Sequence, residues 1–324
     1  MTRRARAAGA GTAGGAGPAG RGAARLLPPG AVEEYVEVPA GVLRVLRAGR
    51  GGSGHPPLVL LHGGGTDNAA ISWYRAMAPL AAAGPRGEQR EVWAIDLPGF
   101  GGSIDVPAVG GPVELAGVVA DAMGELGIPS AVVFGVSMGG DVALTLALQR
   151  PEFVAGLVLV APGGLVPFVR DRSTHYWAWL AAQAPDWLLL PAGRFANRFV
   201  RTALRAIVRD IATLPPEVVD EFVREARDPR GVLGYARYNQ ATLGRYGMLN
   251  DHTADVHRIA APALFVHGED DPIVDPGGSR RAAELMPHAR LVMVPECGHW
   301  AQLEAHDRFV AEVRGFLAEE FGAR

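Results

Sequence analysis

Gly135-Val136-Ser137-Met138-Gly139 joins two stretches of sequence that differ in character. The run 130–134 before it is apolar and rich in β-branched residues, which predicts a buried strand. The run 141–148 after it contains helix-forming residues and stops just before Pro151, so we expect a helix there. A strand, a tight glycine-lined turn and a helix are the setting of a nucleophilic serine, which makes Ser137 the candidate nucleophile. The alternative is that Ser137 only caps the helix.

A serine hydroxyl is a weak nucleophile near neutral pH and needs a general base that a carboxylate orients. The run 263–268 predicts a second buried strand, and several carboxylates follow it. We assign the orienting role to Asp271, because it stands three residues past the strand-ending Gly268 and just before a Pro-Ile-Val segment. The carboxylates considered less suitable are Asp270, Glu269 and Asp275.

The general base is assigned to His299. This residue follows the last predicted strand, 289–294, and precedes a helix expected from about Ala305 to Phe321. Its place after the serine and the acid matches the order of a Ser-Asp-His triad on an open α/β sheet. His267 stands at a strand end and is expected to be structural. The remaining candidates lie in polar or helical surroundings: His175, His252, His257 and His288.

Two backbone N–H groups are expected to hold the negative oxygen that forms during attack. One belongs to Met138, at the start of the helix after the serine. The other lies in the glycine tract that follows the predicted strand 57–61, where small residues allow close approach to a substrate oxygen. We assign it to Gly64, with Gly63 and Gly65 as alternatives.

These motifs together resemble those of the α/β-hydrolase superfamily, across about residues 33–321. The resemblance implies a mostly parallel eight-stranded sheet with helices on both faces and an inserted helical cap. The matching segments are His62-Gly63-Gly64-Gly65, Asp96-Leu97-Pro98-Gly99-Phe100-Gly101-Gly102-Ser103, Gly135 to Gly140, Gly268 to Asp271 and Gly298-His299-Trp300.

The segment from Cys297 to Glu304 is similar to the ending of the carbon–carbon bond hydrolases of aromatic meta-cleavage pathways, which act on 2-hydroxy-6-keto dienoates. That similarity implies that Trp300 lines the substrate pocket, and Val136 is assigned to the same pocket. Those enzymes usually carry asparagine where this chain has Val136, and a Pro-Gly pair where the glycine tract here continues with Thr66. A carboxylesterase-like hydrolase accounts for the segment equally well.

The chain has 324 residues, a formal net charge of −3 and one cysteine. No basic stripe and no run long enough to span a membrane are evident, so we expect neither nucleic acid nor membrane as a partner. The single Cys297 cannot form an internal disulfide; we expect a buried neutral thiol and a cytoplasmic location. No metal and no cofactor is expected, because no paired histidine or cysteine spacing occurs. A small molecule is the expected partner, and the oligomeric state stays open, with a homodimer as one possibility.

Three regions are expected along the chain. Residues 1–30 are rich in alanine, glycine and arginine and should form a disordered tail. Residues 31–163 and 256–324 should form the α/β core, with an antiparallel edge from the strands 33–38 and 42–46 and a helix over Trp73–Ala82. Residues 164–255 lack convincing strands, and we expect them to form a helical cap over the serine. One of its arginines can bind a substrate carboxylate: Arg194, Arg198, Arg201, Arg205 or Arg209.

The sequence thus predicts a serine hydrolase that acts on a small ester or a related acyl or carbonyl substrate. A carbon–carbon bond hydrolase for dienoates is the first alternative. An acyltransferase differs only in the group that accepts the acyl chain. A ligand-binding protein that has kept the fold without catalysis is the alternative from another class, and an activated Ser137 would exclude it.

Overall fold

The computed structural model describes residues 25–52, 54–82, 89–228 and 230–322. Eight strands of this part form a sheet in the order β1-β2-β4-β3-β5-β6-β7-β8. The first two strands and the β2–β4 pair are antiparallel, and every other neighbouring pair is parallel. This confirms the expected mostly parallel sheet with an antiparallel edge. The strands are β1 (Val32–Val38), β2 (Gly41–Ala48), β3 (Leu58–Leu61), β4 (Val92–Ile95), β5 (Ala131–Val136), β6 (Val154–Val160), β7 (Ala263–Gly268) and β8 (Ala289–Val294).

Alternate side chains along each strand enter two separate apolar cores. Along β5, for example, Val132 and Phe134 belong to one core, while Ala131 and Val133 belong to the other. Helices cover both cores, so the central strands are buried along their whole length. The helices α1 (Ala69–Trp73), α2 (Met77–Ala81) and α12 (His306–Phe321) cover the first, and α3 (Pro112–Glu125), α4 (Met138–Gln149) and α10 (Pro276–Leu285) cover the second.

The single helix expected over Trp73–Ala82 is wrong in its bounds. The Asn68 side chain accepts a hydrogen bond from the Ile71 N–H at 2.9 Å and so starts α1 at Ala69. The chain leaves the helical path after Trp73 and resumes it at Met77 in α2. A side-chain cap outside the apolar run therefore set the start of the first helix.

Part of the expected tail is ordered. Arg25 forms an ion pair of 2.6 Å with Glu225, and the Leu26 carbonyl accepts a hydrogen bond of 3.1 Å from Arg44. Residues 25–30 therefore lie against the folded chain, because two guanidinium groups fix them. Residues 1–24, where the rest of the expected tail falls, lie outside the described residues.

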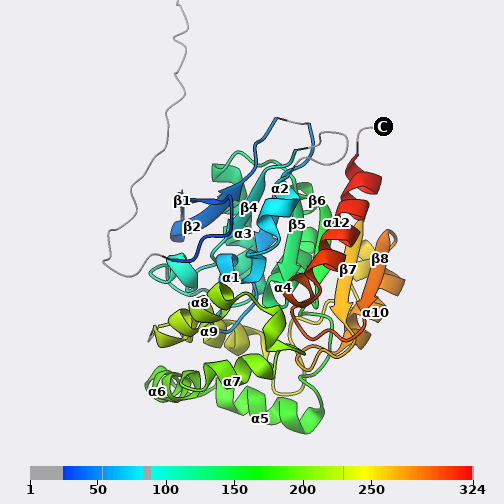
Figure 1. Cartoon of the computed structure of the whole chain (residues 1–324). Coiled ribbons are helices and arrows are strands. Elements are labelled where there is room, and N and C mark those ends of the chain that lie inside the picture. The colour runs from blue at the N-terminus through cyan, green and yellow to red at the C-terminus, as the bar shows by residue number, and fades with distance from the viewer. Residues whose placement is uncertain (1–24, 53, 83–88, 229, 323–324) are drawn as a thin grey trace, which may run out of the picture.

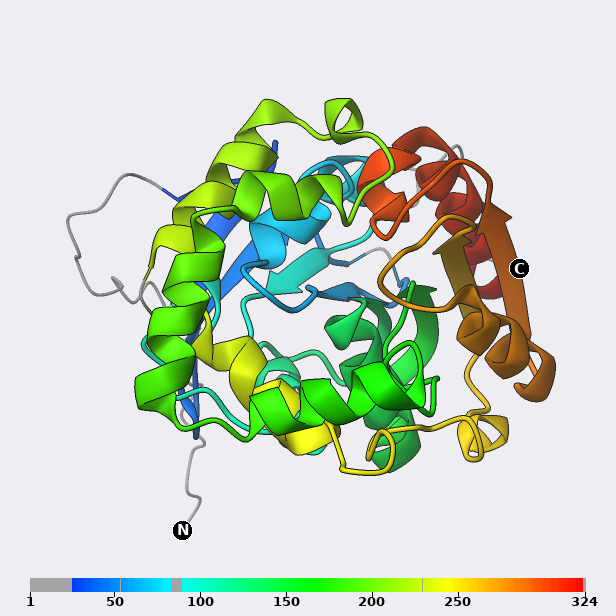
Figure 2. The ribbon, with the colours of Figure 1, turned by 90° about the horizontal axis from the view of Figure 1, so that it is seen from below.

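Five helices lie between β6 and β7 and are called the insert helices below. Figure 1 shows them together at one end of the sheet, and Figure 2, from below, shows them in an arc around that end. Among the described residues, no helix combines the length and the apolar character needed to cross a membrane. The insert helices are α5 (Arg172–Ala182), α6 (Asp186–Asn197), α7 (Val200–Arg205), α8 (Pro216–Arg227) and α9 (Leu233–Thr242). The short elements are η1 (Gly101–Ser103), η2 (Pro151–Phe153), η3 (Ile211–Thr213), η4 (Val256–Arg258) and α11 (Ala301–Glu304).

Candidate active site

Ser137 occupies the turn between β5 and α4. Its φ of 53° and ψ of −116° place a non-glycine residue in a sparsely populated backbone region. Two backbone hydrogen bonds hold this conformation: the Ser137 N–H donates to the Val160 carbonyl at 3.0 Å, and the Ser137 carbonyl accepts from the Gly163 N–H at 2.8 Å. This is the geometry of a nucleophile elbow, in which the strained turn presents the serine hydroxyl at the edge of the sheet.

The glycines beside Ser137 are required by close backbone contacts. A Cβ on Gly135 would lie 2.2 Å from the Gly139 carbonyl oxygen. A Cβ on Gly139 would lie 2.4 Å from the Leu61 carbonyl oxygen. The sequence pattern of two glycines around the serine therefore reflects the packing of the turn against itself and against β3.

Asp271 and His299 meet at the carboxyl edge of the sheet. The His299 Nδ1 lies 2.7 Å from Asp271 Oδ2 and donates a hydrogen bond to it. A neutral ring that donates from Nδ1 keeps Nε2 free to accept a proton, as a general base must. Ser137 Oγ makes no hydrogen bond to His299 within the described part of the chain; such contacts often form only when substrate binds.

The other carboxylates near the end of β7 make different contacts. Asp270 is 41% exposed and forms an ion pair of 2.9 Å with Arg209. Asp275 caps α10 by accepting the Gly277 N–H at 2.9 Å. Of the acids weighed from the sequence, Asp271 is the one that bonds to His299.

Asp271 is held as an anion by four donors. One oxygen accepts the N–H groups of Ile273 and Val274 at 2.7 and 3.1 Å, and the other accepts His299 and His267, the latter at 3.1 Å. Burial alone raises the pKa of Asp271, but the hydrogen bonds from His267 and His299 outweigh burial and lower it below its usual range. The carboxylate is therefore ionised near neutral pH.

His267 is a second histidine on the same carboxylate. Its Nε2 lies 3.1 Å from both Asp271 Oδ2 and the Val274 carbonyl, so this nitrogen carries the proton. Its Nδ1 lies 2.8 Å from Ser279 Oγ, and the ring is fully buried. The sequence analysis expected a structural residue here; the contact with Asp271 needed the register of β7 and the turn after it.

The glycine tract after β3 lies next to the serine. A Cβ on Gly63 would be 3.7 Å from Ser137 Cβ. The Gly63 N–H donates to Asp67 Oδ2 at 2.9 Å, which removes it as a free donor. The Gly64 N–H has no hydrogen-bond partner within the described chain, and the Met138 N–H stands at the first position of α4, where helices leave donors unpaired.

Asp67 fixes the shape of this tract. Besides Gly63, it accepts hydrogen bonds from Ser72 Oγ at 2.6 Å and from the Asn68 N–H at 2.8 Å. Burial raises the pKa of Asp67, although these hydrogen bonds act in the opposite direction. The sequence analysis gave Asp67 no role, because nothing in the local pattern shows that it folds back onto the glycines.

A buried network links the helix after Ser137 to the insert helices. Asp141, fully buried in the first turn of α4, accepts hydrogen bonds from Tyr238 Oη at 2.6 Å, Asn250 Nδ2 at 2.5 Å and His252 Nε2 at 2.8 Å. Burial, together with the Asp141 carboxylate, raises the pKa of Tyr238 well above its usual range. A carboxylate inside an otherwise apolar helix was the signal in the sequence, but its three partners are too far along the chain to be found that way.

The loop that carries His299 is held from two sides. The His299 N–H donates to the Ile207 carbonyl at 3.1 Å, which ties the loop to the segment after α7. Glu304 accepts the N–H groups of Gly298, Trp300 and Arg209 at 3.1, 3.0 and 2.7 Å. The position of the histidine therefore depends on both α11 and the insert.

A cavity of about 1310 Å³ lies between the sheet edge and the insert helices. Ser137, Met138 and Asp271 line it from the sheet side. The rest of its lining is mostly apolar and comes from α5, α6 and α9 and from the loops at residues 163–170 and 272–275. Such a volume exceeds the usual range for small-molecule sites, which is about 300–1,000 Å³. In the described residues, no cluster of three or more histidine, cysteine or acidic side chains is arranged to hold a metal ion.

Two residues assigned to the substrate pocket do not line this cavity in the described structure. Trp300 is 3% exposed, and its ring packs edge-on against Phe222 with centroids 5.5 Å apart. Val136 is fully buried, because its side chain points from β5 into the first core. Both assignments are corrected: these side chains support the residues beside them rather than facing the cavity.

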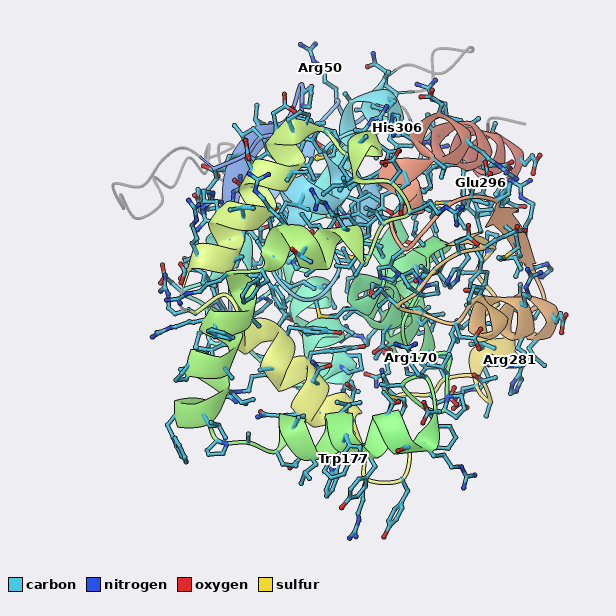
Figure 3. The ribbon with its side chains drawn as sticks, turned by 60° about the horizontal axis from the view of Figure 1, so that its bottom comes forward. Arg50, Arg170, Trp177, Arg281, Glu296 and His306 are labelled. Atoms are coloured by element: carbon cyan, nitrogen blue, oxygen red, sulfur yellow. The ribbon has the colours of Figure 1, made fainter. Side chains whose placement is uncertain are left out.

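The arginines of the cavity also differ from those considered in the sequence. Arg170 and Arg281 line it, and neither has an ion pair within the described residues. Figure 3 shows Arg170 between α5 and the centre of the molecule, and Arg281 on α10. The five candidates from the sequence do not line the described cavity: Arg194, Arg198, Arg201, Arg205 and Arg209.

Cys297 precedes the histidine loop as a buried thiol. Burial, with the nearby acidic groups, raises the pKa of Cys297 to about 12. The thiol is therefore protonated and unreactive near neutral pH, as expected from the sequence.

Comparison with known proteins agrees with this geometry. A family model described as the alpha/beta hydrolase fold matches residues 56–306. The 2-hydroxy-6-oxononadienedioate/2-hydroxy-6-oxononatrienedioate hydrolase of Burkholderia vietnamiensis (strain G4 / LMG 22486) is 33% identical over 272 residues, which cover 82% of this chain and 88% of the relative.

Solved structures give the same result. The 2-hydroxy-6-oxo-6-phenylhexa-2,4-dienoate hydrolase of Rhodococcus sp. strain RHA1 is similar with a TM-score of 0.65 and 26% identity, over 90% of this chain and 99% of the other. A carboxylesterase of Bacillus subtilis shares the fold with a TM-score of 0.68 and 22% identity, over 89% of this chain and 92% of the other. The chain therefore belongs to the α/β-hydrolase family of enzymes.

Proposed function

We propose that the protein is a serine hydrolase that cleaves small esters or related acyl and carbonyl compounds with Ser137, His299 and Asp271. The observation that carries the proposal is the 2.7 Å hydrogen bond between His299 and the buried, ionised Asp271, which lines the same cavity as Ser137. A serine on a strained turn without such a pair would have no base. A binding protein that had lost catalysis would have no need for this pair.

The reaction follows from these positions. His299 Nε2 takes the proton of Ser137 as its oxygen attacks the substrate carbonyl carbon, and the Met138 and Gly64 N–H groups stabilise the oxygen that becomes negative. Asp271 stabilises the resulting imidazolium. His299 then protonates the leaving group, and water, deprotonated by the same histidine, releases the acyl group from Ser137.

In this proposal residues 164–255, which contain the insert helices, act as a cap that selects the substrate. Most of the cavity lining from α5 and α6 is alanine and leucine, so an apolar acyl or aromatic group fits it best. An apolar lining also excludes bulk water from the hydroxyl, which strengthens the electrostatic contacts in the site.

A carbon–carbon bond hydrolase is the second candidate. Relatives named for dienedioate hydrolysis favour it, and so do Arg170 and Arg281, two cations of the cavity that are free to meet a carboxylate. The same triad would then serve ketonisation of the dienoate and cleavage next to the ketone. Val136 in place of the usual asparagine favours the ester.

The deciding experiment compares the wild type and Ser137→Ala on a short-chain aryl ester and on a 2-hydroxy-6-keto dienoate. The proposal expects the wild type to cleave the ester faster and Ser137→Ala to lose activity on both compounds. A wild type that strongly prefers the dienoate would establish the second candidate. A Ser137→Ala variant as active as the wild type would refute both.

Two arginine variants, Arg170→Gln and Arg172→Gln, test whether a cation of the cavity binds the carboxylate of a dienoate. If the dienoate is the substrate, Arg170→Gln should raise its KM on the order of tenfold, as expected for a charge-assisted hydrogen bond. Arg172→Gln is the matched control, since Arg172 stacks on Phe168 and does not line the described cavity. Equal KM values for both variants would show that the cavity cation does not bind substrate.

A further inference from the structure

The outer side of α6 carries large apolar side chains in solvent. Trp187 and Phe195 of α6, and Phe199 in the turn between α6 and α7, are 75%, 62% and 57% exposed. The two phenylalanine rings pack against each other with centroids 5.7 Å apart. With Leu188, which is 49% exposed, these side chains place four large apolar groups in solvent over a short stretch of the chain.

The inner side of the same helix is also apolar. Leu189, Gly193 and Ala196 line the catalytic cavity. A surface helix ordinarily turns a polar side to water, so a helix that is apolar on both sides needs a second apolar surrounding outside the protein.

The neighbouring helix α5 repeats this arrangement. Trp177 is 64% exposed, and Figure 3 shows it on the outer side of α5, pointing away from the sheet. Tyr176 and Leu180 on the same helix are 37% and 43% exposed, while Ala178 and Ala182 line the cavity. Only residues 183–185 separate the two helices, and Figure 1 shows both at the end of the insert that lies away from the sheet.

Residues 172–209 carry a positive net charge, whereas the whole chain carries a negative one. The whole chain has a net charge of −3, but residues 172–209 contain six arginines and a single carboxylate, Asp186, which pairs with Arg237 at 2.6 Å. Within the described residues, Arg194, Arg198 and Arg205 are exposed and form no ion pair. Unpaired arginines beside exposed tryptophans complement an anionic, partly apolar surface.

We propose that the outer sides of α5 and α6, with Arg194, Arg198 and Arg205, form a docking face on which the protein lies on an anionic lipid bilayer. The tryptophan and phenylalanine rings enter the interface between headgroups and acyl chains, and the arginines bind lipid phosphates. The expectation of no membrane partner rested on the lack of a spanning run, which such a contact does not require.

A second copy of this chain fits the docking face less well. A two-fold pair places the same patch of each subunit against the other, which brings the unpaired arginines of both copies together. Repulsion between them opposes association, whereas a bilayer that contains acidic lipid neutralises them. The inner sides of α5 and α6 line the cavity that Ser137 also lines, so a substrate dissolved in the bilayer would have a short path to Ser137.

Vesicle co-sedimentation of the full chain tests the docking face. The Ser137→Ala form is used, so that lipid hydrolysis cannot change the vesicles and the outcome is independent of the proposed reaction. We expect binding to vesicles of phosphatidylcholine with phosphatidylglycerol, weak binding to phosphatidylcholine alone, and a loss of binding as salt is raised.

Two variants identify the residues. Trp177→Ser/Trp187→Ser should weaken binding on the order of tenfold or more, since each ring leaves the interface. Arg194→Gln/Arg198→Gln should weaken binding roughly fivefold for each arginine removed, and only on acidic vesicles. Leu285→Ser is the matched control, because Leu285 is 48% exposed at the last position of α10, which connects β7 to β8 and lies outside the insert helices.

Two results would overturn the proposal. One is equal sedimentation of the tryptophan variant and the Leu285→Ser control. The other is a wild-type dimer, measured by light scattering, that Trp177→Ser/Trp187→Ser converts to monomers; the face would then be a contact between two copies. Unchanged activity of both variants on a water-soluble ester, with Ser137 restored, would show that they are folded.

Discussion

The carboxyl edge of the sheet and the insert helices meet at the same cavity but are built in opposite ways. At the sheet edge, Asp271 accepts four hydrogen bonds and Ser137 is fixed by backbone bonds on two sides. In the insert, α6 has no buried residue, and Trp187 is 75% exposed. The comparison teaches that hydrogen bonds on several sides fix Ser137, Asp271 and His299, whereas α6 has no buried residue and lies over the cavity with much of its surface in solvent.

The largest effect should come from breaking the sheet edge at its carboxylate. Asp271→Asn keeps the shape but removes the charge that orients His299, so we expect kcat to fall roughly ten-thousand-fold. The relative rates on different esters should stay the same, because the cavity wall is unchanged. Steady-state kinetics on an ester series measures both.

Asp270→Asn is the matched control for this change. Asp270 is exposed and pairs with Arg209, and exposed pairs contribute little, about 0–1 kcal/mol, so its kcat should be close to that of the wild type. If kcat falls equally in Asp271→Asn and Asp270→Asn, the rate depends on negative charge near the loop and not on the hydrogen bond between Asp271 and His299.

The second-largest effect is expected where the glycine tract at the sheet edge touches α9 of the insert. A Cβ at Gly64 would lie 2.3 Å from the Tyr235 ring of α9, so Gly64→Ala must push the glycine tract away from Ser137. A displacement of this kind costs on the order of a hundredfold in kcat. The double variant Gly64→Ala/Tyr235→Ala removes the clash and should recover part of the rate. If the double variant is no better than the single one, α9 does not lie on the tract as described.

The third effect concerns the second histidine of Asp271. His267→Leu removes a hydrogen bond to a charged group, which is worth about 1.5–3 kcal/mol, so kcat should fall on the order of tenfold or more with KM unchanged. His267→Gln keeps a donor at the place of Nε2 and should restore most of the rate. A loss of thermal stability without this split between kcat and KM would instead show a purely structural role.

The smallest effect is expected from the insert. Ala178→Phe fills part of the cavity wall, so KM should rise about tenfold for a long acyl or phenyl substrate and stay the same for an acetyl ester. Ala203→Phe on α7, which does not line the described cavity, is the control. A fall in kcat on the acetyl ester would contradict a wall that only selects substrates.

The two regions also differ in how far the sequence predicted them. The strands, their order in the chain and the assignment of Ser137, Asp271 and His299 followed from local patterns, because each residue stands just after an apolar run. The eight-stranded sheet is confirmed, and the structure brings Asp271 and His299 together.

What the sequence did not predict depends on contacts between distant segments. Trp300 was assigned to the pocket because its segment is similar to the ending of the meta-cleavage hydrolases, but in the structure its ring packs against Phe222. The partners of Asp141 lie about a hundred residues further on, and no local pattern connects them. The exposure of Trp187 and Phe195 on α6 depends on how the helix lies over the cavity, which no local pattern shows.

The central claim is that Ser137 is a nucleophile activated by His299. Treatment of the native protein with a fluorophosphonate, followed by intact mass measurement and peptide mapping, tests it most directly. The account predicts one adduct, on Ser137, that is absent in Ser137→Ala and strongly reduced in His299→Ala. No adduct on the wild type, or an adduct on another residue that survives in Ser137→Ala, would contradict it.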